Sequence, residues 1–309
     1  MKPRLNFIIG CTACGKSAVG FELAKRIGAE IVVVDSMKVY RRMDLGTGKP
    51  TAVRRAEVPY HMIDIVEPSE QFSVARYVDH ASQAIADIHA RGRPILMVGG
   101  TSLYIMGLTH GLLDSPGDDP EFRARLRARA DQEGNEPLHA ELRTVDPEAA
   151  ERIHLNDYRR IERALEVHHL TGVPISRLQT QWESSEGDFD CRFIGLRREL
   201  KDQNHRINNR ARKMMQAGLL DEVRALLAED QPLSTQASQA VGYAELIRHL
   251  RDELSLEDAF EQVKIHSRRL GKSQRTWSKR FRAVEWFDLE VDEDTDSIVN
   301  RILDRVSFE

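Results

Sequence analysis

Short apolar runs and amphipathic stretches alternate along the first hundred residues. Leu5–Ile9, Glu30–Val34 and Pro94–Val98 have the length and the β-branched content typical of buried strands. Ala18–Ile27, and a stretch that begins at Ser73, instead place their apolar residues on one face of a helix. Strands that alternate with helices in this way predict a doubly wound parallel sheet.

The pattern changes at about Asp114. From there to about Gly187 the chain holds short arginine-rich helical stretches, separated by Asp-Pro and Pro-Gly breaks, with little strand signal. The longest is Asp157–Thr171, with Asn156 as its expected N-cap and Gly172 as its C-cap. This region is therefore predicted to be an all-helical insertion in the α/β core.

The segment between the first strand and the first helix matches a phosphate-binding loop. Gly10–Ser17 fits the pattern G-x-x-x-x-G-K-[ST] without a mismatch. In such loops, backbone N–H groups at the positive end of the helix surround a phosphate, Lys16 adds charge and Ser17 offers its hydroxyl to Mg²⁺. The motif indicates a diphosphate or a triphosphate without deciding between them. The expected phosphate ligands are Gly10, Thr12, Ala13, Cys14, Gly15, Lys16 and Ser17.

Together these patterns predict the α/β fold class, with a P-loop NTPase-like parallel sheet core flanked by helices and an all-helical insertion domain. We expect residues 1–113 to form the first part of the core and residues 114–187 the insertion domain. Residues 188–309 then form the second part of the core, which includes a basic helix.

The overall composition says little about the partners of the protein until the distribution of charge along the chain is considered. The net charge of −4 gives no hint of nucleic acid, but Lys264–Arg282 contains basic residues and no acid. Three cysteines are too few for a disulfide framework, and the C-x-x-C of Cys11 and Cys14 lies at loop positions that tolerate many side chains. With no signal peptide and no membrane-spanning run, we expect a cytoplasmic monomer with no membrane partner.

Two sets of side chains are candidates for chemistry beside the loop. Asp35 follows the second strand, at the edge where α/β sheets bind ligands. It could hold magnesium or an acceptor in a kinase, or accept a proton from an attacking amine or hydroxyl in a group transferase. Arg206 and Arg210 lie one helical turn apart, and two guanidinium groups suit a departing diphosphate. A solvated basic helix face is the alternative interpretation of this pair.

Two basic surfaces are expected to flank the phosphate loop in the folded protein. The insertion supplies Arg159, Arg160 and Arg163, and Trp277 interrupts a second basic stripe. Such stripes can follow an RNA backbone, although a solvated face is again the alternative, and their combination favours nucleic acid as the second substrate. The second stripe recurs every three or four residues at Lys264, Arg268, Lys272, Arg275 and Lys279.

Several further motifs follow the loop in a fixed order up to about residue 282. They are Asp35–Arg41, Met43–Pro50, Val58–Asp64, Gln71–Ala75, Gly99–Tyr104, Gln239–Tyr243 and Lys272–Trp277. Together with the loop they resemble the bacterial tRNA dimethylallyltransferase family, the isopentenyl transferases that modify the adenosine next to the anticodon. Several motifs in order are far more specific than a phosphate loop alone.

The resemblance implies a reaction in which the exocyclic amine of a flipped-out adenine, 3′ to the anticodon, attacks the first carbon of dimethylallyl diphosphate and expels pyrophosphate. Asp35 would accept the amine proton, and Thr101 would hydrogen-bond near the reacting adenine. The phosphate loop, Mg²⁺ on Ser17, and Arg206 with Arg210 would stabilise the leaving diphosphate. We assign Asp35, Thr101 and Arg210 as the catalytic residues.

The resemblance also implies that a set of residues grips the anticodon stem and loop of tRNA. Some positions depart from the family pattern: Cys11 and Cys14 replace the usual proline and serine, and Lys38 stands where glutamine is usual. A point charge cannot read a base edge as an amide does, so base preference is open to change. The implied tRNA-binding residues are Ser36, Met37, Lys38, Thr101, Arg123, Arg159, Arg160, Ile161, Glu162, Arg163, Gln239, Gly242, Tyr243, Arg268, Lys272, Gln274 and Trp277.

Two other functions compete with tRNA prenylation. A small-molecule or nucleotide kinase would use the same loop on ATP. The other is a non-catalytic RNA-binding protein with a phosphate loop. Such a protein has no catalytic activity, so a substitution of Asp35 could not abolish one.

Overall fold

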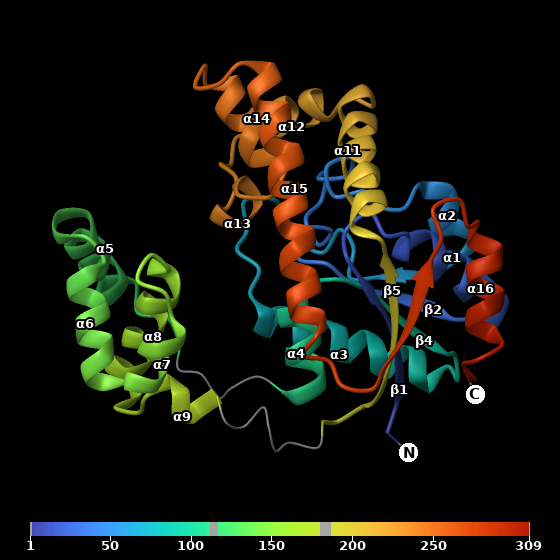
Figure 1. The fold of residues 1–309 in the computed structure, drawn as a ribbon, viewed down its shortest axis with the longest axis horizontal. Coiled ribbons are helices and arrows are strands. Elements are labelled where there is room, and N and C mark those ends of the chain that lie inside the picture. Colours follow the sequence, from blue (N-terminus) through green and yellow to red (C-terminus); the bar gives the residue numbers. More distant parts are fainter. Residues whose placement is uncertain (1, 112–116, 180–186, 309) are drawn as a thin grey trace. The chain divides into compact units, whose positions relative to one another are not determined.

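The computed structural model describes residues 2–111, 117–179 and 187–308, which fold into two compact units (Figure 1). The first unit combines Met1–Thr109 with Asp188–Glu309, and the second comprises His110–Gly187. The expected boundary between residues 113 and 114 lies outside the described residues. In those described ranges, no helix has both the length and the apolar character that a membrane crossing requires.

A six-stranded parallel sheet in the order β3-β2-β4-β1-β5-β6 forms the centre of the first unit. In β1, Ile8 pairs with Val98 of β4 on one side and with Ile194 of β5 on the other. The residues of β2 and β4 are all buried because helices cover both faces of the sheet. The predicted α/β fold is thus confirmed. The strands are β1 Arg4–Gly10, β2 Glu30–Val34, β3 Tyr60–His61, β4 Ile95–Gly99, β5 Asp190–Arg198 and β6 Val284–Leu289.

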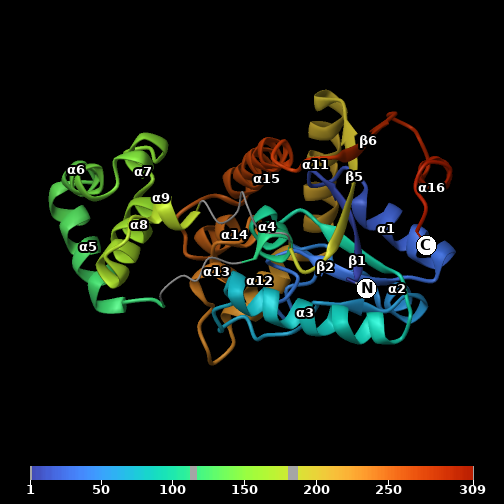
Figure 2. The ribbon, with the colours of Figure 1, turned by 90° about the horizontal axis from the view of Figure 1, so that it is seen from below.

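Helices α1 and α3 lie on opposite faces of the sheet (Figure 2). Right-handed crossovers produce this arrangement, because the chain moves from β1 outward to β2 and then returns to β4 between them. On one face α16 packs beside α1, and on the other Tyr77 stacks on Tyr104 at 3.9 Å between ring centroids. These helices are α1 Lys16–Ile27, α2 Ala52–Glu57, α3 Val74–Ala90, α4 Ser102–His110 and α16 Thr295–Leu303.

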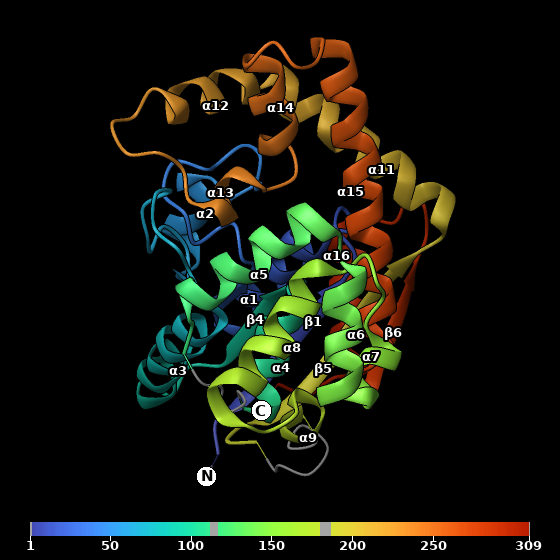
Figure 3. The same cartoon turned by 90° about the vertical axis from the view of Figure 1, so that its left-hand side faces the viewer.

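A group of helices follows β5 (Figure 3). The long helix α15 packs along α11 and α14, and α14 also contacts α12. Ser255 begins α15, because its hydroxyl accepts the backbone N–H of Asp258 at 3.0 Å. The helices are α11 Leu200–Gln216, α12 Leu219–Leu227, α13 Thr235–Ser238, α14 Tyr243–Leu250 and α15 Leu256–Ser278.

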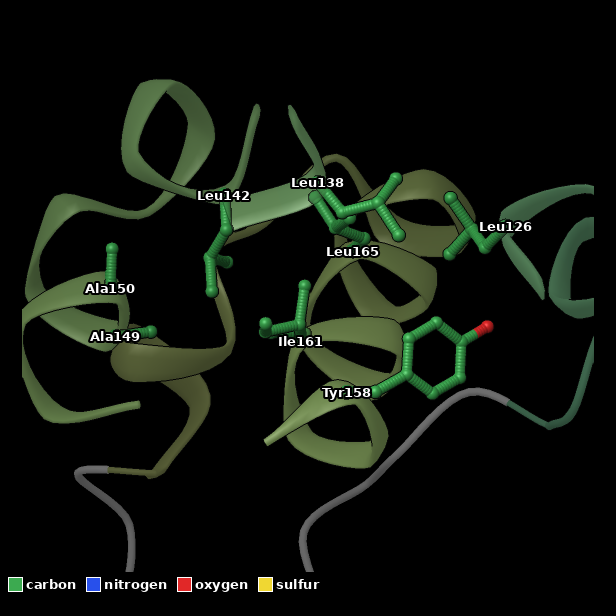
Figure 4. Packing of buried hydrophobic residues seen from close by; sticks show 9 residues of the cluster. Leu126, Leu138, Leu142, Ala149, Ala150, Tyr158, Ile161 and Leu165 are labelled. Atoms are coloured by element: carbon green, nitrogen blue, oxygen red, sulfur yellow. The ribbon is translucent and has the colours of Figure 1, made fainter. Parts of the chain in front are cut away.

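The second unit is helical throughout its described elements and has its own apolar core, which includes Leu138, Leu142, Ile161 and Leu165 (Figure 4). Its longest predicted helix begins one residue later than expected, since Asp157, rather than Asn156, accepts the N–H of Arg160. The helices are α5 Pro120–Glu133, α6 Glu136–Val145, α7 Pro147–Arg152, α8 Tyr158–Thr171 and α9 Ile175–Gln179.

Candidate active site

A cavity of about 1220 Å³ in the first unit lies at the carboxyl ends of β1, β2 and β4. This is the edge at which parallel α/β sheets bind ligands, and the volume is ample for a drug-sized molecule. Four groups of residues line it: the phosphate loop, the turn Asp35–Lys38, the segment Asp44–Lys49 and the segment Gly99–Leu103. Side chains of α11 and α15, and the segment Gln239–Tyr243, form further parts of the wall.

The phosphate loop has the backbone conformation of an anion site. Gly10, Ala13 and Gly15 adopt positive φ angles of 149°, 61° and 114°, and α1 begins at Lys16. Within the part of the chain that the structure describes, the backbone amides of Ala13, Gly15, Lys16 and Ser17 make no hydrogen bond. Unpaired amides at the positive end of a helix favour a bound anion.

Three side chains hold the carbonyl groups of the same loop. The Lys16 ammonium donates to two of them, at 2.8 and 2.7 Å. Gln203 of α11 donates to a third, and Arg198 of β5 to a fourth, the latter at 3.0 Å. Because these carbonyl groups are already paired, a bound anion meets amide donors rather than acceptors. The four carbonyl groups belong to Gly10, Cys11, Thr12 and Cys14.

The carboxylate of Asp35 is fixed by its own turn. One oxygen accepts the backbone N–H groups of Met37 at 2.9 Å and Lys38 at 3.3 Å. The second oxygen makes no hydrogen bond to the described residues, and Asp35 lines the cavity. On the neighbouring strand end, the Thr101 hydroxyl accepts the N–H of Ser36 at 3.1 Å. The structure therefore brings two predicted catalytic residues to one wall and leaves an oxygen of Asp35 free to accept a proton.

The two arginines of α11 have different environments. Arg210 donates to the Thr12 hydroxyl at 3.3 Å and to the carbonyl of Thr47 at 3.1 Å, so it lies against the phosphate loop. Burial lowers the pKa of the Arg210 guanidinium from its ordinary value, although an arginine of this kind stays protonated. Arg206 also lines the cavity, but its Nε donates to both carboxylate oxygens of Asp202 at 3.1 and 3.0 Å. Of the predicted pair, Arg210 is the better placed for an anion.

Glu222 of α12 organises the segment Asp44–Lys49. Its carboxylate accepts the backbone N–H groups of Asp44, Leu45 and Gly46 at 3.1, 2.8 and 3.3 Å, and the hydroxyl of Tyr243 at 2.6 Å. The ring of Tyr243 is 0% exposed and packs so closely on Gly46 that a Cβ there would lie 2.4 Å from it. The ring is thus held inside the first unit beside the cavity, and the expectation that Tyr243 contacts tRNA stays a prediction.

Gln274 of α15 is also occupied inside the protein. Its Oε1 accepts the backbone N–H of Thr12 at 2.7 Å, and its Nε2 donates to the carbonyl of Gly100 at 3.3 Å. A residue expected to contact tRNA therefore ties the phosphate loop to the end of β4. Trp277, one turn later, lines the cavity and has the Arg280 guanidinium 4.3 Å from its ring centroid.

The remaining tRNA candidates of the first unit vary in exposure. Lys272 is exposed, whereas Arg268 is half-buried and donates to Asn208 at 2.7 Å. Gln239 is exposed at the cavity rim, and Gly242 begins α14, where its N–H donates to Glu245 at 2.7 Å.

Arg123 and Arg163 of the second unit surround a buried carboxylate. The Glu166 side chain is 0% exposed and accepts from the Arg123 guanidinium at 2.7 and 2.8 Å, from the N–H of Asp119 at 2.9 Å, and from Arg163. Burial alone would raise the pKa of Glu166, but these hydrogen bonds hold it below its ordinary value. Both arginines thus have a structural partner, which sequence spacing did not reveal.

Helix α8 presents the other candidates of the second unit. Arg159 and Arg160 are exposed, and Glu162 accepts the hydroxyl of Tyr158 at 2.6 Å. Ile161 is 0% exposed and belongs to the core. The neighbouring arginines are the accessible side chains, and the expectation that Ile161 contacts tRNA stays a prediction.

The cysteines offer no sign of redox chemistry. Cys11 and Cys14 are both buried, and burial raises the pKa of the Cys11 thiol, which disfavours a thiolate. Among residues 2–111, 117–179 and 187–308, no group of three or more His, Cys, Asp or Glu side chains could hold a metal ion.

Comparisons with known proteins agree with this geometry. The model of the IPP transferase family matches residues 38–281, and that of the isopentenyl transferase family matches residues 3–59. The tRNA dimethylallyltransferase of Geobacter metallireducens is 44% identical over 302 residues, which cover 98% of this chain and 97% of the relative. That of Shouchella clausii is 45% identical over 285 residues, which cover 92% and 90%.

Solved structures of tRNA isopentenyl and dimethylallyl transferases are also similar to this chain. The full-length tRNA isopentenylpyrophosphate transferase of Bacillus halodurans is 39% identical, with a TM-score of 0.70 over 98% of this chain and 96% of that one. A eukaryotic dimethylallyltransferase, captured acting on tRNA, is 27% identical with a TM-score of 0.77 over 92% and 73%. These matches confirm the resemblance carried by the motifs and do not favour the kinase alternative: the chain belongs to the IPP transferase family.

Proposed function

We propose that this enzyme transfers a dimethylallyl group from dimethylallyl diphosphate to the exocyclic amine of the adenosine 3′ to the anticodon in tRNA, and releases pyrophosphate. Relatives with that name align with nearly the whole chain. The observation that carries the proposal is the shared cavity. Asp35, which has one carboxylate oxygen without a hydrogen-bond partner, and the phosphate loop with its unpaired backbone amides both line it.

The loop and two cations bind the diphosphate. The free amides of Ala13, Gly15, Lys16 and Ser17 meet its oxygens, and Lys16 exchanges its loop carbonyls for a phosphate oxygen. Arg210, which already lies against Thr12, adds a guanidinium. Negative charge on the diphosphate grows as its bond to carbon breaks, so these donors stabilise the transition state more than the ground state.

Asp35 takes the proton that the reaction releases. The lone pair of the adenine amine forms the new bond to the first carbon of the donor, and the carbon–oxygen bond breaks with its electron pair leaving on pyrophosphate. The nitrogen then carries an excess proton, which the free oxygen of Asp35 accepts. Thr101 lies beside this turn, where its hydroxyl holds Ser36.

Magnesium fits the site through Ser17. The Ser17 side chain is exposed at the cavity, and its hydroxyl has no partner within the described ranges. Mg²⁺ commonly takes only one or two protein ligands and completes its shell with phosphate oxygens and water, so a cluster of acids is not required. When bound, the ion would neutralise charge on the diphosphate.

Exposed basic residues of both units supply the tRNA contacts in this proposal. Arg159 and Arg160 of α8, and Lys272 of α15, are the accessible side chains. Unstacking the target base costs a few kcal/mol, which contacts to the backbone phosphates offset.

The test is incubation of the full chain with dimethylallyl diphosphate, Mg²⁺ and unmodified tRNA, followed by mass analysis of the digested nucleosides. The expected result is a gain of one prenyl group on a single adenosine of the anticodon loop. A Lys16→Ala variant is the matched control and should lose the reaction with the loss of its phosphate contact. Phosphoryl transfer from ATP without prenylation would contradict the proposal and support a kinase.

A further inference from the structure

Lys38 is a buried lysine without a partner. It follows Asp35 in the turn after β2, lines the cavity and is 8% exposed. In the described part of the chain its ammonium makes neither a hydrogen bond nor an ion pair. An unpaired buried charge is energetically unfavourable, so such groups are rare outside functional sites.

Two neighbouring lysines, in contrast, have hydrogen-bond or ion-pair partners for their ammonium groups. The Lys49 side chain is 2% exposed, and its ammonium donates to the Tyr40 carbonyl at 2.5 Å, to Asp44 at 2.7 Å and to Asp64 at 2.6 Å. Lys16 donates to two carbonyl groups of its own loop. The absence of a partner is therefore particular to Lys38, whose side chain faces the cavity instead.

The charges around Lys38 are predominantly positive. The charged groups that act on it most strongly are the acid Asp35 and three cations: Arg210 of α11, Lys16 of the phosphate loop and Lys49 of the segment after β2. Burial first, and then these three cations, lower the pKa of Lys38 to about 8, while Asp35 acts in the opposite direction. This excess of cations favours a multiply charged anion over a neutral base as the group that Lys38 binds.

We propose that the Lys38 ammonium is a ligand of the diphosphate group of the allylic donor, together with Lys16 and Arg210. The assignment rests on the proposed function, because it takes the donor's diphosphate as the anion that these cations bind. It differs from the expectation that Lys38 contacts tRNA. Near pH 8, where part of the population carries a neutral amine, diphosphate binding then draws a proton from solvent onto Lys38.

Calorimetric titration of the full chain with inorganic pyrophosphate and Mg²⁺ tests the proposal. At pH 8.5, in buffers of different ionisation enthalpy, the wild-type chain should take up more protons than Lys38→Met. Protonation of pyrophosphate itself is common to both, so the difference reports Lys38. At pH 7 the affinity of Lys38→Met should be lower by about tenfold or more. Lys38→Arg, which keeps its charge at every pH, should bind well and lose the extra uptake.

One control variant and three outcomes decide between the interpretations. Lys201→Met, an exposed lysine of α11 outside the cavity, should match the wild type. If the wild type binds no pyrophosphate, the proposed function itself fails. If the wild type binds and Lys38→Met matches it in affinity and proton uptake, the Lys38 assignment is overturned and the function stands. A Lys38→Met variant that loses tRNA binding alone would also overturn the assignment, in favour of a base contact.

Discussion

One carboxylate oxygen of Asp35 accepts the N–H groups of Met37 and Lys38, and the other oxygen is free in the cavity. Asp35→Asn keeps the size of the side chain but cannot accept a proton. We expect prenyl transfer in a single turnover to slow by about 10²- to 10⁴-fold, while tRNA affinity changes little. Asp79→Asn, at an exposed position of α3, is the control. Similar rates for the wild type and Asp35→Asn would refute the proton-acceptor role.

Individual side chains were predictable where a strand end fixes them. Asp35 and Thr101 follow neighbouring strands, and the Thr101 hydroxyl accepts the N–H of Ser36, the residue after Asp35, as the parallel sheet leads one to expect. Gln274 was not assignable in this way, since its partner Thr12 is 262 residues away in sequence. Sequence spacing likewise does not reveal that Tyr243 turns inward to Glu222.

Elements were predictable from periodicity, and their ends less so. The apolar runs gave β1, β2 and β4, because strands buried on both faces leave a continuous signal. The start of α8 differed by one residue, since Asn156 and Asp157 are both good caps and local sequence does not choose between them. The long-range anchor of the segment after β2, Glu222, left no recognisable pattern at all.

Glu222 gives a prediction for that segment. Glu222→Ala removes the acceptor of three backbone N–H groups and of the Tyr243 hydroxyl. We expect a loss of about 2 kcal/mol in the free energy of unfolding. The KM for the donor should also rise, since the segment supports Arg210 through Thr47. Denaturant unfolding and steady-state kinetics measure both, and Asp221→Ala, which removes only a pairing with Arg224, should change neither.

The basic stripe of α15 gives a second prediction at this scale. Lys272 is exposed, whereas Lys264 is already paired with Glu261. Lys272→Ala should reduce the slope of log tRNA affinity against log salt by about one, as expected for one lost phosphate contact. Lys264→Ala should reduce it less. Equal slopes for the wild type and Lys272→Ala would remove this residue from the tRNA interface.

At the scale of the whole molecule, the separate core of the second unit predicts separate unfolding. Glu166→Gln removes the charge that Arg123 and Arg163 share, so we expect the second unit to lose about 3 kcal/mol. Differential scanning calorimetry of the full chain should show one transition moving and the other unchanged. Glu148→Gln, at an exposed position of α7, is the control. Equal movement of both transitions would contradict independent units.

The same carboxylate sets a dependence on pH. The pKa of Glu166 is lower in the folded chain than its ordinary value of 4.5, so its stabilisation is complete above that value. It is lost as the pH falls below 4.5 toward the pKa of the folded state. The transition of the second unit should therefore be more acid-sensitive in the wild type than in Glu166→Gln.

The central position of β1 has a consequence for synthesis of the protein. Its partners are β4 on one side and β5 on the other, and β5 is translated only after the entire helical insertion. On the ribosome, the edge of β1 that later pairs with β5 therefore stays unpaired while the second unit is being synthesised. Open strand edges recruit other chains. A polypeptide released by premature termination before Asp190 would keep that edge permanently and become a substrate for chaperones and proteases.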